Sequence, residues 1–336
     1  MTSVGYSDDQ LSSTPFTDYD TEGILCENHE NFESMTLSHT VFYSLVFFLS
    51  LVGNSLVLWV LVKYESLESL TNVFILNLCL SDLVFSCLLP FWVVVHYYDW
   101  IFGEFFCKLL NMLFSISLYS SIIFLMVMTT HRYISVVHPL SNLGGHSCWS
   151  RVGIILGIWM ASIMVSVPDT IFHTVLTDKS CDFSEPKWFL LSTYLHNLFF
   201  IFSLVVTLFC YVQILRTLFQ SHTRRRHRTV RLIFTIVVAY FLSWAPYNMV
   251  LFLQTLVKLG YIQNCEVIKK LNYWEHICRE FAFSHCCFNP VLYVFVGIKF
   301  RRHLKALCRQ IWPSQWSLTS SPRSPRAFLY EDASFF

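Results

Sequence analysis

The chain has few charged residues for its length. Only 13% of its 336 residues are Asp, Glu, Lys or Arg, while 54% are hydrophobic and the mean hydropathy is +0.51. Soluble domains carry about 25% charged residues. This shortage excludes an ordinary soluble protein and indicates that most of the chain lies in a membrane.

Several features of secreted proteins and enzymes are also missing. Roughly the first thirty residues are polar and acidic, so we expect no cleavable signal peptide and expect the first apolar span to direct its own insertion. The sequence has no Asn-x-Ser/Thr acceptor, no Gly-rich phosphate loop and no internal repeat. It has no nucleophile–base pair and no metal-ligand spacing. We therefore expect no enzyme, no structural metal and no nucleic-acid partner.

Long apolar stretches dominate what is present. A membrane-spanning helix needs about 20 mostly apolar residues. Seven stretches meet this requirement: 37–62, 71–96, 107–137, 151–174, 188–215, 229–257 and 274–297. We expect an acidic tail over 1–36, an all-α seven-transmembrane helix bundle over 37–297, an eighth, amphipathic cytoplasmic helix over 298–311, and a disordered cytoplasmic tail over 312–336.

The basic residues predict the orientation of these spans, because cytoplasmic connections carry more Lys and Arg. With the N-terminus outside, 16 of the 23 basic residues fall on the cytoplasmic side and 7 on the other. We expect a multi-pass plasma-membrane protein with an extracellular N-terminus and a cytoplasmic C-terminus.

Residues 1–33 contain eight acidic residues and no Lys or Arg. Tyr19 lies between Asp18 and Asp20, which makes it a candidate for sulfation. One interpretation is a solvated, disordered tail, as acidic segments usually are. We favour a second, in which the dense negative field attracts a basic protein ligand and speeds its encounter.

The twelve cysteines divide by topology. Cys26, Cys107, Cys181 and Cys265 fall in extracellular segments, where disulfides form, and four cysteines allow three pairings. The sequence alone does not choose among them. Cys308 follows the amphipathic segment, where palmitoylation and a plain free thiol are both compatible with its position.

The spans contain polar residues that are costly in hydrocarbon. His285, Asn289 and Tyr293 are spaced four residues apart on the last span, so they share one face, and Pro290 removes a backbone hydrogen bond beside them. Asp82 lies in the middle of the second span. Such residues usually face a bundle interior or a hydrated cavity and have a function.

We expect these side chains to meet others in one polar core. Ser117 and Ser121 share a face of the third span that leads to Arg132 at its cytoplasmic end, and Asn54 comes from the first span. Oxygen ligands around Asp82 would suit an allosteric Na⁺. The alternative is a hydrogen-bonded packing network without an ion; we favour the ion.

A second proline lies in the sixth span, in Trp244-Ala245-Pro246. Proline allows a helix to bend, and a large aromatic beside the bend can repack between two arrangements. The motif alone is also compatible with a static bend.

Taken together, the motifs resemble rhodopsin-like (class A) G protein-coupled receptors over residues 37–310. They are Asn54 in Gly-Asn-Ser, Leu78 to Asp82, Arg132-Tyr133, Trp159, Trp244-x-Pro246 and Asn289-Pro290-x-x-Tyr293. Each motif alone is weak evidence for this resemblance, whereas the order of the motifs across seven spans is specific to it. The resemblance implies switch and G-protein-coupling roles for Arg132, Tyr133, Tyr211, Trp244, Pro246, Pro290 and Tyr293.

Narrower features are similar to the chemokine receptor family: Trp92 after Pro90, Trp100-x-Phe102-Gly103 before Cys107, and His285-Cys286-Cys287-x-Asn289-Pro290. The family pattern implies disulfides Cys26–Cys265 and Cys107–Cys181. The segments Tyr64 to Leu70 and His131-Arg132-Tyr133 are similar to the XC class of chemokine receptors, whose ligand is lymphotactin. That resemblance implies Gi/o coupling, calcium mobilisation and chemotaxis of dendritic cells.

The sequence departs from the family at several positions. His131 replaces the usual Asp before Arg132; without that charge pair we expect higher basal activity. Ser203 stands where the fifth span usually has proline, and Leu88 replaces a Thr. Arg279 occupies a position where many chemokine receptors carry Glu to bind a ligand amine. Glu275, Glu280 or Asp169 would then have to take that amine.

The resemblance implies a two-step mechanism. A basic chemokine docks on the acidic tail, and its flexible end enters a cavity lined by Trp92, Phe114, Asp169, Tyr247, Arg279 and Glu280. The bundle then admits the C-terminal helix of a G protein near Arg132, Tyr211 and Tyr293. Receptor kinases would phosphorylate Ser317, Thr319, Ser320, Ser321 and Ser324 to recruit arrestin, and Arg224 to Arg228 would contact anionic lipid.

Two alternatives belong to other functional classes. A scavenging receptor would bind chemokine and internalise without activating G protein, and His131 is the feature that favours it. A transporter or channel would need inverted repeats or interrupted helices at the midplane, and the sequence indicates neither.

Overall fold

The computed structural model describes residues 32–138, 148–177, 179–220, 224–296, 302–304 and 306. Its elements follow in this order: α2 (Phe32–Tyr64), α3 (Leu70–Tyr98), α4 (Gly103–Val137), α5 (Cys148–Phe172), β1 (His173–Val175), β2 (Cys181–Phe183), α6 (Pro186–Gln220), α7 (Arg224–Lys258), α8 (Cys265–Phe283) and α9 (His285–Val296).

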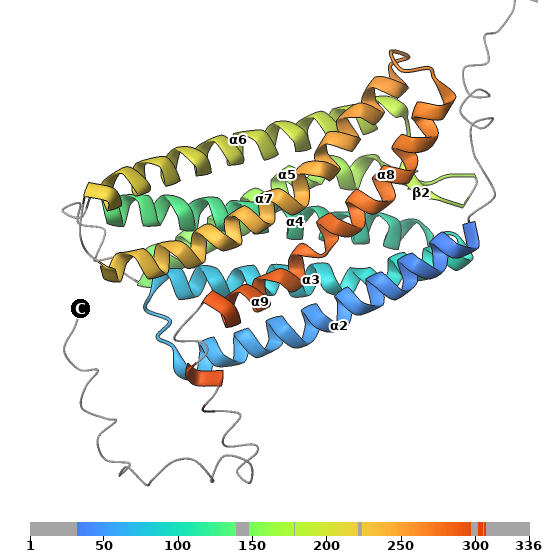
Figure 1. Cartoon of the computed structure of the whole chain (residues 1–336). Helices are drawn as coiled ribbons and strands as arrows, with labels where there is room; N and C mark the ends of the chain where they lie inside the picture. The colour runs from blue at the N-terminus through green and yellow to red at the C-terminus, as the bar shows by residue number, and fades with distance from the viewer. Residues whose placement is uncertain are drawn as a thin grey trace, which may run out of the picture.

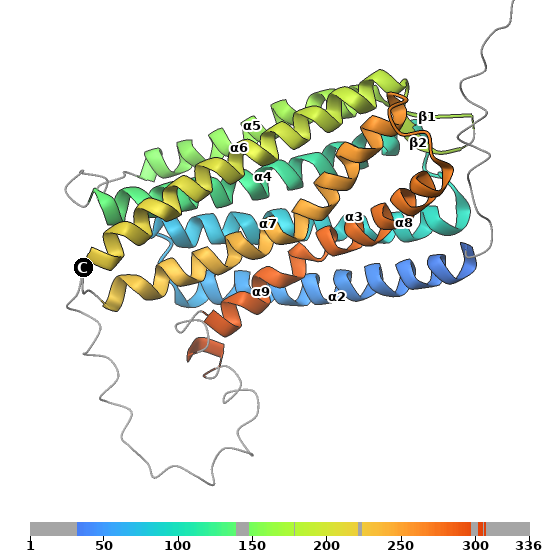
Figure 2. The same ribbon diagram turned by 45° about the horizontal axis from the view of Figure 1, so that its top comes forward.

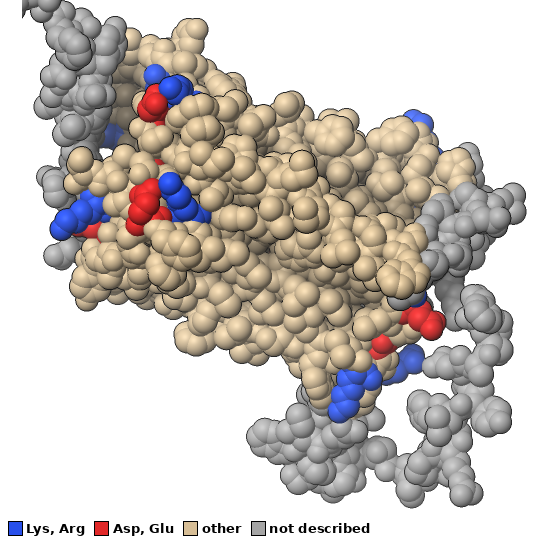
Figure 3. All heavy atoms as spheres, turned by 180° about the vertical axis from the view of Figure 1, so that it is seen from behind, with Lys and Arg blue, Asp and Glu red and all other residues tan. Residues whose placement is uncertain are grey.

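The long helices lie side by side in one bundle (Figure 1). Helices suit a membrane because they satisfy every backbone polar group within the segment. Six of the described helices are long and apolar enough to cross a membrane. Seen from behind, charged side chains gather at the two ends of the bundle and leave the middle uncharged (Figure 3). The exposed apolar side chains along α6, such as Leu198 and Val205, therefore suit contact with lipid.

Helix α4 lies at the centre of the bundle and contacts α3, α5, α6 and α7. In its most apolar stretch 67% of residues are buried, against 17% for α5, which lies at the periphery. The serines of α4 therefore face other helices rather than lipid, which places them where a polar core can form.

The expected seventh span consists of two helices. We predicted one apolar segment over 274–297, whereas α8 begins earlier, at Cys265, and ends at Phe283, and α9 begins at His285. Asn264 caps the start of α8 by accepting hydrogen bonds from the backbone N–H groups of Glu266 and Val267 over 3.0 and 3.3 Å. Ser284 separates the two helices, and α9 lies between α2 and α7 (Figure 2).

A short hairpin covers one end of the bundle. Strands β1 and β2 pair antiparallel, with Val175 opposite Cys181. Cys181 forms a disulfide with Cys107 in the second turn of α4. Cys265 is also disulfide-bonded; its expected partner, Cys26, lies outside the described residues. The pairing implied for Cys107 is thus confirmed.

Little of the expected eighth helix over 298–311 belongs to the described residues. Residues 302–304 are helical, and His303 lies 3.4 Å from Glu65, from its Nε2 to the Oε1 of the carboxylate. The ring of His303 stacks on Tyr64 at the end of α2. These contacts fix this segment beside the α2–α3 connection.

Candidate functional site: a polar core linking the two ends of the bundle

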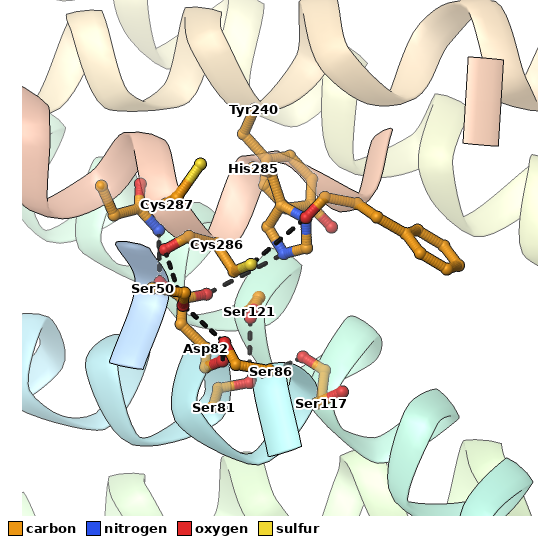
Figure 4. A network of polar contacts seen from close by, with 12 residues as sticks. Ser50, Ser81, Asp82, Ser86, Ser117, Ser121, Tyr240, His285, Cys286 and Cys287 are labelled. Atoms are coloured by element: carbon orange, nitrogen blue, oxygen red, sulfur yellow. Dashed lines mark hydrogen bonds and ion pairs between the residues drawn. The ribbon is translucent and has the colours of Figure 1, made fainter. Parts of the chain in front are cut away.

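Asp82 of α3 is fully buried at the centre of the bundle. Asn289 of α9 donates from Nδ2 to Asp82 Oδ2 over 2.7 Å. The other oxygen, Oδ1, has no hydrogen-bond partner among the described residues, and His285 Nε2 lies 3.9 Å from it, too far for a hydrogen bond. Figure 4 shows His285 and Asp82 facing each other from α9 and α3. The core thus contains one unsatisfied carboxylate oxygen.

The imidazole of His285 has a defined orientation. Its Nδ1 lies 2.8 Å from the carbonyl oxygen of Ala282, which can only accept, so Nδ1 carries a hydrogen. In the neutral ring Nε2 then presents a lone pair toward Asp82. Two acceptor atoms then face each other, an arrangement that a positively charged group beside them would stabilise.

Serine hydroxyls line the side of this core toward α4. Ser81 donates to the carbonyl of Ser117 over 2.7 Å, and its oxygen lies 2.9 Å from that of Ser121. The hydroxyl of Ser117 itself donates to the carbonyl of Phe114. The expected Ser121 therefore reaches the serine cluster with its side chain, whereas Ser117 contributes its backbone carbonyl.

A third set of contacts joins α2 to the proline of α9. Pro290 has no N–H, so it cannot bond the carbonyl of Cys286 four residues earlier. Asn54 donates to that carbonyl over 2.9 Å, and Ser50 donates to it over 3.3 Å. Asn54 therefore satisfies the backbone group that the proline leaves free, and it fixes α9 against α2.

Aromatic rings connect this core to the wider part of the bundle. Trp244 of α7 is buried; its ring centroid lies 5.2 Å from that of His285 and 6.3 Å from that of Phe283. Pro246 follows within α7. Between Trp244 and His196 lies a cavity of about 10 Å³, the size of a single water site. Because the rings of Trp244 and His285 are in contact, a movement of Trp244 would displace His285 directly.

The end of the bundle nearer the hairpin holds the predicted ligand contacts. Phe114 packs against Trp92 and Phe283, with ring centroids 6.4 and 5.5 Å apart. Tyr247 packs edge-on against Trp244 at 6.0 Å. The predicted aromatic contacts thus lie on the side of the polar core that faces the hairpin.

Charged residues at this end pair with one another. Arg279 lies 3.4 Å from Glu275, Nη1 to Oε1, and its Nη2 donates to His276 Nδ1 over 2.7 Å. Glu280 contacts His39 of α2 over 2.6 Å, Oε1 to Nδ1. The network joins α8 to α2, so a ligand group that enters here must compete with existing contacts.

Asp169 of α5 lies in a separate environment. Its carboxylate accepts hydrogen bonds from Ser115 over 3.0 Å and from Ser192, between α4 and α6. It is therefore already engaged, as are Glu275 and Glu280. None of the three carboxylates proposed to take a ligand amine is without a partner.

The opposite end of the bundle contains Arg132. Its Nη2 donates to Thr71 Oγ1 over 2.6 Å. The ring of His131 lies edge-on to Phe74 of α3. Tyr133 packs against Phe209, and Tyr211 packs edge-on against Phe234 of α7, with centroids 5.0 Å apart. These contacts hold α4, α6 and α7 together at this end.

Some predicted residues fall outside what the structure describes. They are Asp18, Tyr19, Asp20, Cys26, Cys308, the phosphorylation candidates from Ser317 to Ser324, and the side chains of Arg224 to Arg228 and of Tyr293. Conversely, sequence reasoning missed His39 and Thr71. Their only signal was a polar residue near the end of an apolar span, which is common.

Comparison with known proteins identifies the family. The model of the family "7 transmembrane receptor (rhodopsin family)" matches residues 53–293. Chemokine XC receptor 1 of Homo sapiens is 62% identical over 327 residues, covering 96% of this chain and 98% of the relative. The chain belongs to the chemokine receptors of the rhodopsin family.

The similarity extends to further chemokine receptors. Chemokine XC receptor 1 of Mus musculus is 61% identical over 97% of this chain and 99% of the relative, and C-C chemokine receptor type 4 of Homo sapiens is 37% identical over 80% and 78%. The resemblance inferred from motifs is confirmed, including the XC class. Chemokine receptors are multi-pass membrane proteins that respond to chemokines and act through G proteins, and they are not a class of enzymes.

Proposed function

We propose that this chemokine receptor binds a basic chemokine of the lymphotactin type and activates Gi/o heterotrimeric G protein, driving calcium mobilisation and chemotaxis. A single observation carries the proposal. Contacts run from Glu280 in α8 through His39 and Tyr43 of α2 to Phe283. They continue from Phe283 through Trp244 to His285 beside Asp82. A ligand that moves α8 would therefore displace the polar core.

The first step is docking on the extracellular tail. The negative charge of Asp18 and Asp20, with a sulfated Tyr19 between them, raises the encounter rate of a basic chemokine. This step needs no defined tail structure, because long-range attraction between net charges is sufficient.

The second step is entry of the flexible end of the chemokine above Trp92 and Phe114. There it competes for Arg279, which Glu275 and His276 hold in the absence of ligand. Exchange of these partners, with loss of the Glu280–His39 contact that joins α8 to α2, changes the position of α8 and favours one bundle arrangement over the other. Such a difference in affinity is required, since a ligand that binds both arrangements equally shifts neither.

We also propose an allosteric Na⁺ beside Asp82. The buried Oδ1 without a partner supports this proposal, because an unpaired carboxylate oxygen in the bundle interior is costly. Asp82 and the Ser121 hydroxyl supply hard oxygen ligands, and Asn289 orients the carboxylate. Such an ion would neutralise Asp82 and stabilise the arrangement of α3 and α9 described above.

The last step is opening of the cytoplasmic end. Helix α7 bends at Pro246, moves away from Tyr211 and exposes Arg132 to the C-terminal helix of the G protein. The cytoplasmic tail then serves receptor kinases and arrestin, and the basic start of α7 contacts anionic lipid.

Nucleotide exchange tests the proposal. We expect lymphotactin to stimulate exchange on purified Gi in membranes that contain the receptor. Arg132→Ala should abolish this stimulation while lymphotactin still binds, whereas Lys187→Gln, which removes an exposed pair with Glu185, should leave both unchanged. Saturable lymphotactin binding and internalisation without any exchange would instead establish a scavenging receptor.

A further inference from the structure

The residue that holds Arg132 in this receptor is a threonine of the neighbouring helix. Many related receptors carry Asp directly before the arginine, whereas His131 stands here. None of the ion pairs within the described ranges involves Arg132. Its guanidinium instead donates from Nη2 to Thr71 Oγ1 over 2.6 Å.

The contact is well placed to restrain the guanidinium. Thr71 is the second residue of α3 and is only 6% exposed, so water competes poorly for the bond. A hydrogen bond with a charged donor is stronger than one between neutral groups. The Nε atom of Arg132 is also buried and has no hydrogen-bond partner within the described ranges. No second bond from Nε therefore supports the one from Nη2 to Thr71.

The cytoplasmic end is closed while this bond is made. Ile233 and Ile236 of α7 are buried in the same apolar cluster as Ile214 of α6 and Met128 of α4. Tyr211 closes the same side through its ring contact with Phe234. A G-protein helix can reach Arg132 only after these contacts separate and the guanidinium turns away from Thr71.

We infer that Thr71 is a positioning residue, which holds Arg132 in the closed arrangement in place of the missing carboxylate. The inference rests on the proposed G-protein coupling. It replaces our expectation of high basal activity from His131, because the arginine is restrained by α3 instead of by its own neighbour. Basal nucleotide exchange by the unmodified receptor is therefore low.

Substitutions at position 71 separate the hydroxyl from the rest of the side chain. Thr71→Val keeps the shape and removes the acceptor, and Thr71→Ala removes the acceptor in a residue that favours helices. Thr71→Ser keeps the hydroxyl. Thr130→Val is the matched control on α4, since the Thr130 hydroxyl bonds the carbonyl of Met126 rather than Arg132.

The measurement is basal nucleotide exchange on Gi without ligand, at equal receptor density. Loss of the acceptor should raise the basal rate roughly threefold to tenfold in Thr71→Val and Thr71→Ala, since it removes one charge-assisted bond from the closed state. Thr71→Ser and Thr130→Val should stay near the unmodified receptor. Thr71→Ala provides the same readout if Thr71→Val does not reach the membrane.

Two results would overturn the inference: basal exchange unchanged in both variants that lack the hydroxyl, or an equal rise in Thr130→Val, which would indicate general loosening. Lymphotactin-stimulated exchange by the unmodified receptor is measured in the same membranes. If that stimulation is absent, the proposed coupling fails; if it is present and Thr71→Val behaves normally, only the role of Thr71 fails.

Discussion

Gly53 of α2 lies against the ring of Pro290 in α9. A methyl group at position 53 would come within 2.8 Å of Pro290 Cβ and 2.9 Å of its Cγ, closer than side-chain carbons approach each other. The glycine therefore permits the proline of α9 to pack directly on α2. The same contact places the Cys286 carbonyl within reach of Asn54.

Gly53→Ala should destabilise the receptor by forcing α9 away from α2. Overpacking a tight contact costs about 1–3 kcal/mol, and the displaced Cys286 carbonyl would also lose its partners. Thermal unfolding of the purified receptor measures the effect. Gly157→Ala in α5 is the control, because nothing lies within 4 Å of the added carbon; it should be neutral or stabilising by up to about 1 kcal/mol. Equal melting temperatures for the two variants would contradict the close packing.

Asp82→Asn should abolish the effect of sodium on ligand binding. In the unmodified receptor we expect NaCl to lower lymphotactin affinity roughly fivefold relative to an organic-cation chloride at equal ionic strength, since the proposed ion would stabilise the arrangement without ligand. The amide removes the negative charge and keeps the shape of Asp82. Affinity that does not respond to sodium in the unmodified receptor would exclude the ion and leave a hydrogen-bonded packing network.

Arg279→Gln should lower lymphotactin potency by about tenfold or more, because the ligand loses the guanidinium that it would take over from Glu275 and His276. Dose–response curves for nucleotide exchange measure the change. Lys187→Gln is the control: it also removes one positive charge on the extracellular side, but from an exposed pair. The assignment of Arg279 to the ligand site would be wrong if both variants shifted potency equally.

Neutralising the tail should slow association rather than speed dissociation. With Asp18→Asn, Tyr19→Phe and Asp20→Asn combined, the association rate of lymphotactin should fall most at low salt and converge with the unmodified receptor at high salt, where charges are screened. Surface-based kinetics at several NaCl concentrations would measure this. An association rate unaffected at every concentration would rule out the electrostatic role of the tail.

Much of this architecture could be predicted from sequence because the membrane imposes simple requirements. An apolar run of sufficient length must form a helix there, and six spans follow from that rule alone. The polar contact between Asn289 and Asp82 was also predictable, since isolated polar groups in a bundle interior must find each other.

The seventh span was predicted less well for a physical reason. The first turns of helix α8 carry Glu266, Lys269 and Lys270, so a hydropathy criterion places its start too late. Farther along α8, Glu280 is tolerated because it pairs with His39 of α2. That partner lies 241 residues away in the chain, and no local pattern reports such pairing.

The restraint on Arg132 could not be predicted from sequence either. His131 indicated a missing charge pair, and only the packing of α3 against α4 brings the Thr71 hydroxyl to the Arg132 guanidinium. A threonine near the start of an apolar span carries no distinctive signal, because its hydroxyl can bond its own helix equally well.

The central claim is that an extracellular ligand opens the cytoplasmic end by moving α7. The most direct test is the distance between spin labels introduced as non-canonical residues at Arg228 in α7 and at Trp149, which is 85% exposed at the start of α5. Lymphotactin together with Gi should lengthen this distance by several ångströms, in the range of helix movements in switching proteins, and Arg279→Gln should shift the response to higher lymphotactin concentration. An unchanged distance in receptors that bind lymphotactin and stimulate exchange would contradict the account.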